Sequence, residues 1–406
     1  MPEESFVPVL RFCVCSDLHI KEANDEQTKR LRQLIRTTYA IAQNDPSYTA
    51  VDAFLFAGDL TNGGTKAQFE AFRDVVQSEV QAGTRILTVI AKNHDNWEKG
   101  RNAKKTGLQY CRTLLGLPTD THFCIGGIHF IGISTCEKTG RYYSAKQKRW
   151  LKRLLRTIAA EAPDAPIIVA QHEHVRGTVY GSSTFDGWGN AYFKKIFRRY
   201  PQIIHFSGHS HYPLNDPRSI CQKDFTALGT GALSYAEFTV GGDRCVHPPQ
   251  SAQISQGWIA EVDAQNRVRL RGFDFLSGSC LCTYVLSSPA DKTQFSFTAE
   301  QQKQRSNAPA FPENAALTVE ETADAYRITC PAAESRDRFP VFLYRAVGHS
   351  ADDTVTSESY TLHNYWYVQQ QAFYTIELPK KTALQRITVT AENAYGMASA
   401  ALEKQL

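Results

Sequence analysis

Five apolar stretches of this 406-residue sequence are each followed within three residues by aspartate, asparagine or histidine. Taken singly, each group has an ordinary structural explanation, because an aspartate after a strand often caps a helix and Asn-His-Asp often forms a turn. Taken together they suggest more, because burying so many polar groups is costly unless they are paired or bound to a cation. We therefore expect a shared metal site. The candidate ligands are Asp17, His19, Asp59, Asn93, His172, His209 and His211.

The chemistry of these side chains indicates which metal ions they suit. Aspartate, asparagine and histidine without thiolate are typical of Mn, Fe or Zn sites, whereas Mg would use more oxygen ligands and water. Seven ligands exceed what one ion needs, so two ions that share one carboxylate are predicted. Two such ions lie about 3.5–4 Å apart, which suits a phosphate whose attacking and leaving oxygens must both be stabilised.

The apolar stretches alternate with segments of helical spacing. Between residues 26 and 42, for example, Leu31, Leu34 and Ile35 recur at the helical interval. Such alternation predicts a sheet covered by helices, with the loops at the strand ends available for chemistry. The expected strands are 9–15, 52–57, 85–91, a paired segment at 124–134, 167–171 and 203–207, and the expected helices are 26–42, 66–80 and 144–159.

The pattern changes from about residue 219. Short alternating stretches at 224–228, 257–263 and 268–273 predict a second sheet. Residues 299–314 are polar and then contain proline, which predicts a linker. The β-rich tail predicts a small β-sandwich, and its stretch from Ile387 to Gly396 resembles the late strands of fibronectin type III modules. Cys330 and Gln385 stand where those modules have a buried Trp and a corner Tyr.

The order of the polar groups along the chain is specific. It reads Asp-x-His, Gly-Asp, Asn-His-Asp, His and Gly-His-x-His, which resembles the calcineurin-like metallophosphoesterases over about residues 8–275. Ser144, Gln147 and Trp150 also match a helix common in that family. The resemblance implies an α/β fold of two mixed β-sheets packed face to face with flanking helices. The expected domains are a catalytic domain at 1–298, the linker at 299–314 and the β-sandwich at 315–406.

The resemblance also implies a role for each residue. A hydroxide held between two metal ions would attack phosphorus. His94 would protonate the leaving oxygen or stabilise charge on the phosphoryl group, and Asp95 would orient His94 or a ligand histidine. The implied ligands are Asp17, His19 and His211 for one ion, Asn93, His172 and His209 for the other, and Asp59 between them.

Substrate contacts are predicted around these ligands. Lys92 stands where the family usually has glycine, and either points to solvent or aims its ammonium group at the substrate phosphate. The loop after His172 is rich in glycine and aromatic residues, so it is either a specificity loop over the metal ions or an ordinary surface loop. The candidate contacts are Lys92, His174, Arg176, Tyr180 and Tyr212, with Trp97 as a further candidate.

Two relatives are excluded by their own signatures. Purple acid phosphatases carry a tyrosine where Asn62 stands, and the phosphoprotein phosphatase sequence Gly-Asp-x-x-Asp-Arg-Gly is absent. What remains resembles the bacterial branch that includes class III cyclic nucleotide phosphodiesterases. The prediction is hydrolysis of a small phosphoester, a monoester or diester and possibly a nucleotide. A nuclease of the same superfamily, suggested by basic helices such as 146–156, and a catalytically silent scaffold are the alternatives.

Composition limits the partners. A net charge of +4 gives no reason to expect nucleic acid, and no apolar run is long enough to cross a membrane. The acidic start does not resemble an export signal, and the ten cysteines lack zinc-ribbon spacing, so a reducing cytoplasmic location is expected. The C-terminal domain is predicted to bind carbohydrate or a protein partner. An aromatic group would form a ligand platform or, alternatively, pack in its core: Tyr360, Tyr365, Trp366 and Tyr367.

Overall fold

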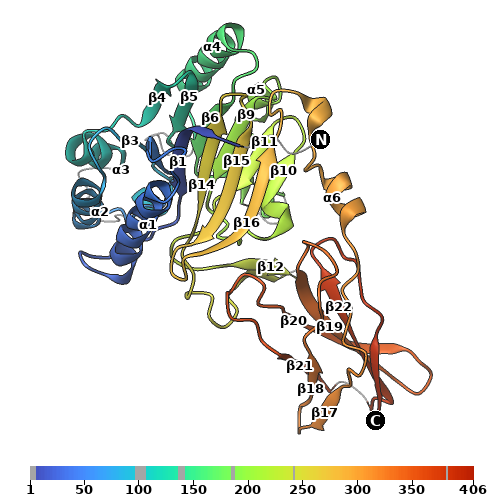
Figure 1. The fold of residues 1–406 in the computed structure, drawn as a ribbon. Coiled ribbons are helices and arrows are strands. Elements are labelled where there is room, and N and C mark those ends of the chain that lie inside the picture. Colours follow the sequence, from blue (N-terminus) through green and yellow to red (C-terminus); the bar gives the residue numbers. More distant parts are fainter. Residues whose placement is uncertain (1–5, 97–106, 136–141, 184–187, 241–242, 381–382) are drawn as a thin grey trace. The chain divides into compact units, whose positions relative to one another are not determined.

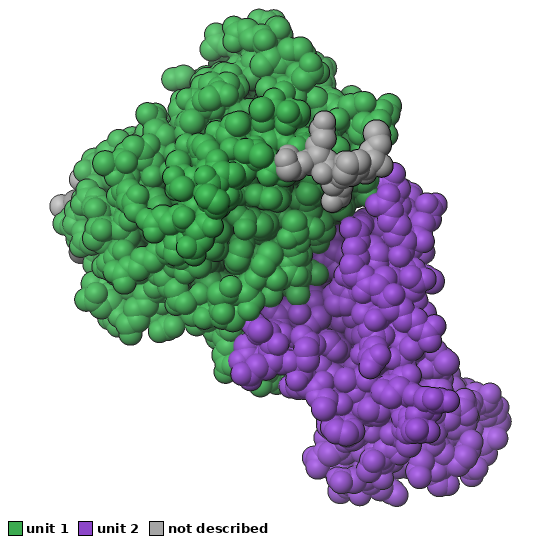
Figure 2. All heavy atoms as spheres, in the orientation of Figure 1, with its two compact units in different colours: residues 1–215, 219–298 green, residues 216–218, 299–406 purple. Residues whose placement is uncertain are grey.

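The computed structural model describes residues 6–96, 107–135, 142–183, 188–240, 243–380 and 383–406. They form two compact units, one of residues 1–215 and 219–298 and the other of residues 216–218 and 299–406 (Figure 2). No described helix is both long and apolar enough to span a membrane. Nine described cysteines form no disulfide, and Cys124, which the sequence places in an apolar segment, is exposed.

The first unit contains two six-stranded mixed sheets, as predicted (Figure 1). Aromatic and aliphatic side chains from both sheets, such as Phe12, Trp258, Phe130 and Phe206, form one buried core, so the sheets pack face to face. One sheet has the order β16-β15-β14-β1-β2-β3, with strands Ser279–Leu286, Val268–Asp274, Gln256–Asp263, Pro8–Cys15, Ala53–Phe56 and Arg85–Thr88. The other has the order β10-β11-β9-β6-β5-β4, with strands Ile220–Gln222, Thr226–Gly229, Ile203–Ser207, Ile167–Gln171, Ile128–Ile133 and Asp120–Ile125.

Helices cover the outer face of each sheet. Helices α1 (Glu26–Gln43) and α2 (Lys66–Glu79) pack on the sheet of β1, and α3 (Gly107–Tyr110) joins the same core cluster. Helices α4 (Ala145–Glu161) and α5 (Lys194–Phe197) pack on the other sheet. The long helices begin where side chains cap their free N–H groups, since Asp25, Thr65 and Ser144 each accept a bond from the backbone N–H three residues further on.

Strand direction brings the candidate ligands to common edges. Strands β1, β2 and β3 pair in parallel, and so do β5, β6, β9 and β11. Parallel strands that pair side by side end at the same edge of a sheet, so the loops after β1, β2 and β3 lie together, as do those after β6 and β9. Two further pairs of short strands lie outside these sheets. Strand β7 (His174–Val175) pairs with β8 (Gly189–Asn190), and β12 (Phe238–Val240) pairs with β13 (Asp243–Val246).

The second unit contains two antiparallel sheets. Ile328, Ala346, Ile376 and Val389 of both sheets share one buried core, which makes a small sandwich. The fibronectin type III likeness stays a prediction. The predicted linker at 299–314 stays a prediction, and helix α6 occupies Ala299–Arg305 within it. The strand order is β17-β18-β21 (Thr318–Glu321, Ala325–Pro331, Phe373–Pro379) and β20-β19-β22-β23 (Val355–Leu362, Val341–His349, Arg386–Asn393, Leu402–Gln405).

Candidate metal centre

Histidine and aspartate side chains from five loops converge at the strand ends. These side chains form three close groups, and the carboxylate of Asp59 belongs to two of them. One of these two groups also contains His19, which belongs to the third group as well. Asp59 therefore lies where a shared ligand is required. Asn93 lies half-buried in the turn just before His94. In each group the ligand atoms lie within 4.8 Å of one another: Asp17 with His19 and His211, Asp59 with His172 and His209, and Asp59 with His19 and His94.

Neighbouring ligand atoms are close enough to share a cation. His211 Nε2 lies 3.1 Å from Asp17 Oδ1 and 3.2 Å from His19 Nε2. On the other side of the cluster, His172 Nε2 lies 3.2 Å from Asp59 Oδ2. All five side chains are buried. The arrangement therefore concentrates carboxylate and imidazole groups in a volume that water reaches poorly.

The backbone is strained at the ligands. Left-handed backbone at a residue other than glycine costs about 1–3 kcal/mol and persists only where the surroundings hold it. Here backbone hydrogen bonds hold the first two loops against each other, from Asp17 N to Gly58 O at 3.0 Å and from His19 N to Asp59 O at 3.1 Å. Five of the seven predicted ligands have positive φ angles: Asp17 (54°), His19 (53°), Asp59 (50°), His209 (74°) and His211 (56°).

Two glycines make room for the ligands that face them. A Cβ atom on Gly58, whose φ is +98°, would lie 2.5 Å from His172 Nδ1. A Cβ atom on Gly208 would lie 2.3 Å from Asp17 Oδ2. The glycines that precede Asp59 and His209 are thus needed for close approach of two loops rather than for chemistry.

Backbone carbonyls orient two of the imidazole rings. His172 Nδ1 lies 3.0 Å from Ala57 O, and His94 Nδ1 lies 3.0 Å from Asn62 O. Each bond requires a proton on Nδ1, so the Nε2 atom of neutral His172 presents its lone pair to the cluster. Orientation of a metal-binding histidine by a second hydrogen bond is typical of protein metal sites.

Burial and neighbouring charges shift the pKa values in opposite directions. Burial raises the pKa of Asp17, but the neighbouring His211 and His172 outweigh it and hold that pKa well below its usual range. Burial lowers the pKa of His172, but the Asp59 carboxylate outweighs it and raises that pKa well above its usual value. A cation would have to displace the proton of His172, so metal affinity rises with pH.

The surroundings of His19 and His209 keep both imidazole rings neutral. Burial, together with the charge of neighbouring histidines, lowers the pKa of each to about 3. Both rings are therefore unprotonated at neutral pH, the form in which imidazole binds metal ions. No proton has to leave them when a cation arrives.

The residues present fit bound metal ions. Among the described residues, Asp59 Oδ1 and His211 Nδ1 are buried and have no hydrogen-bond partner. Buried polar atoms without a partner are rare in folded proteins and call for an explanation such as a missing ion. Oxygen and imidazole donors without thiolate suit borderline divalent or transition metals. The donor set and the orphaned carboxylate oxygen thus agree with the predicted cations.

His94 lies at the edge of the cluster, with its ring centre 4.4 Å from that of His19. Asp95 is buried, and its carboxylate accepts bonds from Thr61 N, Thr61 Oγ1 and Ala91 N, each at 3.0 Å. Burial and the charge of Asp59 raise the Asp95 pKa to about 7. Asp95 therefore fastens the turn that carries Asn93 and His94 to the loop after β2.

Two of the predicted substrate contacts have protein partners. The ammonium group of Lys92 lies over the Tyr142 ring, 4.3 Å from its centre. His174 is fully buried, with Nδ1 at 2.8 Å from Ser207 Oγ and Nε2 at 2.8 Å from Ser210 Oγ. Both ring nitrogens of His174 are thus used within the protein.

The remaining candidates are one exposed arginine and two tyrosines that are bonded within the protein. Arg176 is exposed. Tyr180 and Tyr212 pack together, with ring centres 4.0 Å apart, and their hydroxyl groups bond to Thr239 O and Thr239 Oγ1 respectively. Trp97 lies outside the described residues. These positions remain predictions as substrate contacts.

Sequence reasoning missed one aromatic side chain at the centre. The ring of Tyr235 lies 4.2 Å from that of His211 and 5.9 Å from that of His19, measured between centres. Its segment is held in place by Ser234 Oγ, which donates to Asp17 O at 2.8 Å. The available signal was its position, because Tyr235 follows β11, a further strand parallel to β9. Trp188 packs edge-on against His209, with ring centres 4.8 Å apart.

Comparison with protein families identifies the first unit. The model of the calcineurin-like phosphoesterase family matches residues 10–213, half of the chain, and this span contains every predicted ligand. No curated protein matches the chain.

Comparison with solved structures finds distant matches. The chain is similar to GAP50, the anchor in the inner membrane complex of Plasmodium, with 14% identity, 69% of this chain and 89% of that chain covered, and a TM-score of 0.43. It is also similar to the purple acid phosphatase PPD1 of yellow lupin, with 16% identity, 68% and 53% covered, and a TM-score of 0.47. At these scores neither match carries an argument about function.

Proposed function

Because this chain belongs to the calcineurin-like phosphoesterase family, we propose that it hydrolyses a small phosphoester with two divalent or transition metal ions (Mn, Fe or Zn). The observation that supports this most is the cluster in which Asp59 lies within 4.8 Å of ligand atoms from both sides. Bound cations would lower the pKa of a water molecule and neutralise the phosphate charge. The substrate is a phosphomonoester or phosphodiester, such as a nucleotide.

The chain itself supplies placement and a proton. The strained loops and the buried carboxylates of Asp17 and Asp59 would hold the cations at which the phosphate binds. A ring nitrogen of His94 lies within 4.8 Å of atoms of His19 and Asp59. In our proposal His94 carries the proton that the leaving oxygen takes up, and Asp95 holds its turn in place.

The setting of this activity is also a proposal. The lack of disulfides among the described cysteines supports a reducing compartment such as the cytoplasm. The C-terminal unit would bind carbohydrate or a protein partner. Tyr365 and Trp366 are buried there, which favours core packing over the proposed ligand platform.

Replacement of the shared carboxylate tests the proposal. Asp59→Asn should reduce the bound metal from two ions to one or none and lower kcat by more than about 100-fold, because loss of even an outer partner of a metal ligand costs about 10–100-fold. Elemental analysis and p-nitrophenyl phosphate hydrolysis by the Mn-loaded full chain measure both effects. Asp164→Asn, at an exposed site, is the control. Two retained ions and full activity would contradict the proposal.

A further inference from the structure

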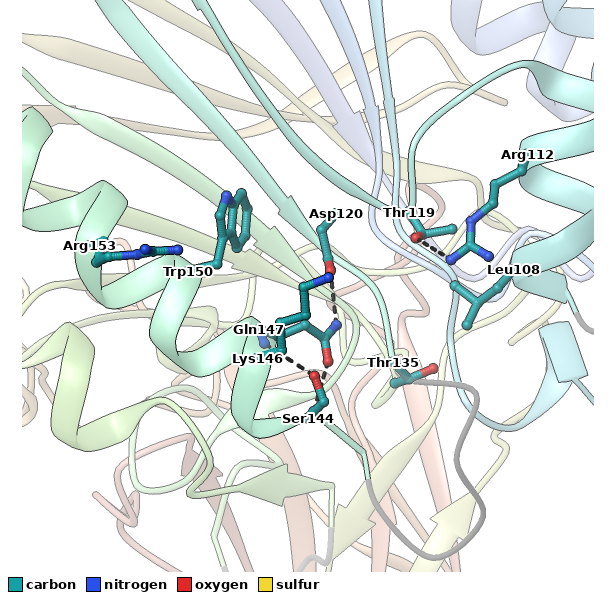
Figure 3. Close-up of a pocket in the computed structure, with 10 residues that line it drawn as sticks. All are labelled: Leu108, Arg112, Thr119, Asp120, Thr135, Ser144, Lys146, Gln147, Trp150 and Arg153. Carbon is teal, nitrogen blue, oxygen red and sulfur yellow. Dashed lines mark hydrogen bonds between the residues drawn. The ribbon is translucent and has the colours of Figure 1, made fainter.

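A cavity of about 460 Å³ opens beside helix α4, and no predicted metal ligand is among its described lining residues (Figure 3). Trp150 and Arg153 of α4 form one side of it, and Arg112 and Leu108 form the other. Between them, Gln147 Nε2 donates to Asp120 Oδ1 at 3.0 Å. Small-molecule sites in proteins have volumes of about 300–1,000 Å³, so the cavity is large enough for a small ligand.

The cavity is positively charged. Arg112, Lys146 and Arg153 line it, whereas Asp120 is the single acidic residue among the described lining residues. Burial raises the pKa of Asp120, and its carboxyl group is already bonded to Gln147. Three cations outnumber the one carboxyl group and attract an anion, and phosphate groups are the ligands for which lysine and arginine are typical.

Helix geometry adds an aromatic surface next to the cations. Lys146, Trp150 and Arg153 follow one another at intervals of four and three residues, so they lie on the same face of α4. Leu151 and Leu155 are fully buried in the core, whereas the Trp150 ring is only partly buried and lines the cavity. An indole face beside cationic groups is suited to a flat ring that carries a phosphate.

We propose that this cavity binds a nucleoside monophosphate, or a ligand of the same chemistry, with its ring against Trp150 and its phosphate at Lys146 and Arg153. The binding site goes beyond the proposed hydrolysis and does not depend on it. Two molecules carry this combination of ring and phosphate: a separate nucleotide that regulates the enzyme, and a nucleotide substrate whose base-bearing part enters the cavity.

The cavity walls are bonded to the segment that carries the centre. Thr135, which lines the cavity, donates from N and Oγ1 to Ile90 O at 3.0 and 3.1 Å. On the other wall, the residue before Leu108 is Gly107, whose N–H donates to Asn96 Oδ1 at 2.8 Å. Ile90 and Asn96 flank the turn that contains Asn93 and His94. Occupation of the cavity is therefore expected to affect the reaction.

Charge reversal on α4 tests the binding site. Isothermal titration with AMP measures the affinity of the metal-loaded full chain and of two double variants. Lys146→Glu/Arg153→Glu alters the cavity, whereas Lys152→Glu/Arg156→Glu makes the same change of charge at exposed positions of the same helix that do not line it. We expect the cavity pair to weaken AMP binding at least 10-fold and the control pair less than 2-fold.

Trp150→Leu tests the ring separately, and its AMP affinity should also fall while inorganic phosphate binding is unchanged. Equal losses of AMP affinity in the two double variants would show that the substitutions changed only long-range electrostatic attraction, and this would overturn the proposal. Unchanged affinity in the cavity pair would place AMP at the metal centre and overturn it as well.

A kinetic arm, which rests on the proposed hydrolysis, distinguishes the two molecules. If the substrate base occupies the cavity, the cavity pair should raise KM for nucleotide esters but not for p-nitrophenyl phosphate. If a separate nucleotide binds, AMP should change kcat for p-nitrophenyl phosphate in the natural chain but not in the cavity pair.

Discussion

At the scale of single residues, hydrogen-bond partners decide which task a histidine can take. His94 and His172 each face a backbone carbonyl with Nδ1, which leaves the opposite edge of the ring toward the cluster. His174 lies only two residues after His172, but serine hydroxyl groups lie at both of its ring nitrogens. Similar imidazoles in one site are thus suited to different tasks, His172 to the proposed metal binding, His94 to the proposed proton transfer and His174 to a structural role.

The proposed proton donor makes a prediction about leaving groups. His94→Ala should lower kcat/KM for alkyl phosphoesters by about 100-fold or more, because general acid catalysis contributes about 10²–10⁴-fold. The loss for p-nitrophenyl phosphate should be much smaller, because p-nitrophenolate leaves without a proton. Parallel assays of both substrates measure the difference, with His122→Ala as an exposed control. Equal losses would remove the role of proton donor.

Residues next to strand ends could be predicted, and side-chain directions could not. The predicted ligands stand out because Asp17 and Asp59 follow buried strands within three residues, where an unpaired carboxylate is costly. The direction of Lys92 depends on a cation–π contact with Tyr142, about 50 positions away, which no local pattern reveals. Tyr235 was missed because a lone tyrosine in a loop is ordinary until the fold places it against His211.

At the scale of elements, close approach of the loops after β2 and β6 builds the centre. The His172 side chain lies against Gly58 and bonds to Ala57 O. This contact joins the two sheets at the metal site, because β2 belongs to one sheet and β6 to the other. The absence of a side chain at residue 58 is therefore a requirement of the site and not only of the turn.

A matched pair of glycine replacements tests this requirement. Gly58→Ala should lower metal affinity by about 10–100-fold, because the new Cβ would displace His172 from Ala57 O. Gly83 has nearly the same φ, +94° against +98°, but no atom within 4 Å of a Cβ. Gly83→Ala should therefore cost stability, about 1–2 kcal/mol, without loss of metal. Chelator competition and urea unfolding measure the two effects, and equal metal affinity in both variants would contradict the argument.

Most elements of the first unit could be predicted from periodicity, because their capping and apolar signals agree. Thr65 and Ser144 begin helices where predicted, and strands 167–171 and 203–207 have their predicted bounds. The third predicted strand continues only to Thr88, because the following apolar residues enter the turn of the site. Strand β16 was missed, since it lies at the edge of its sheet and six of its eight residues are not buried.

At the scale of the whole molecule, the chain leaves the first unit twice. It enters the second unit first at residues 216–218 and again from residue 299, where the composition becomes polar. Within that unit, Pro217 O accepts hydrogen bonds from residues about 85 and 180 positions further along the chain, one of them from Gln302 Nε2 at 3.2 Å. A three-residue excursion has no composition of its own, so the sequence could not indicate it.

Tyr365 makes the most testable of these contacts. Its hydroxyl group donates to Asp216 Oδ2 at 2.8 Å, and Asp216 is fully buried. Loss of a buried bond to a charged group costs about 1.5–3 kcal/mol, so Tyr365→Phe should lower the free energy of unfolding by that amount. Tyr326→Phe, at a buried tyrosine without a hydroxyl partner among the described residues, should cost less than about 0.5 kcal/mol.

The same contact predicts how a truncated chain behaves. The three core clusters of the first unit draw only on residues before 299, so residues 1–298 should fold and retain metal. Residues 216–218 should no longer be held in place, because Asp216 loses Tyr365 and Pro217 loses Gln302. Urea unfolding and elemental analysis of both chains measure this. An insoluble or metal-free product would contradict this prediction.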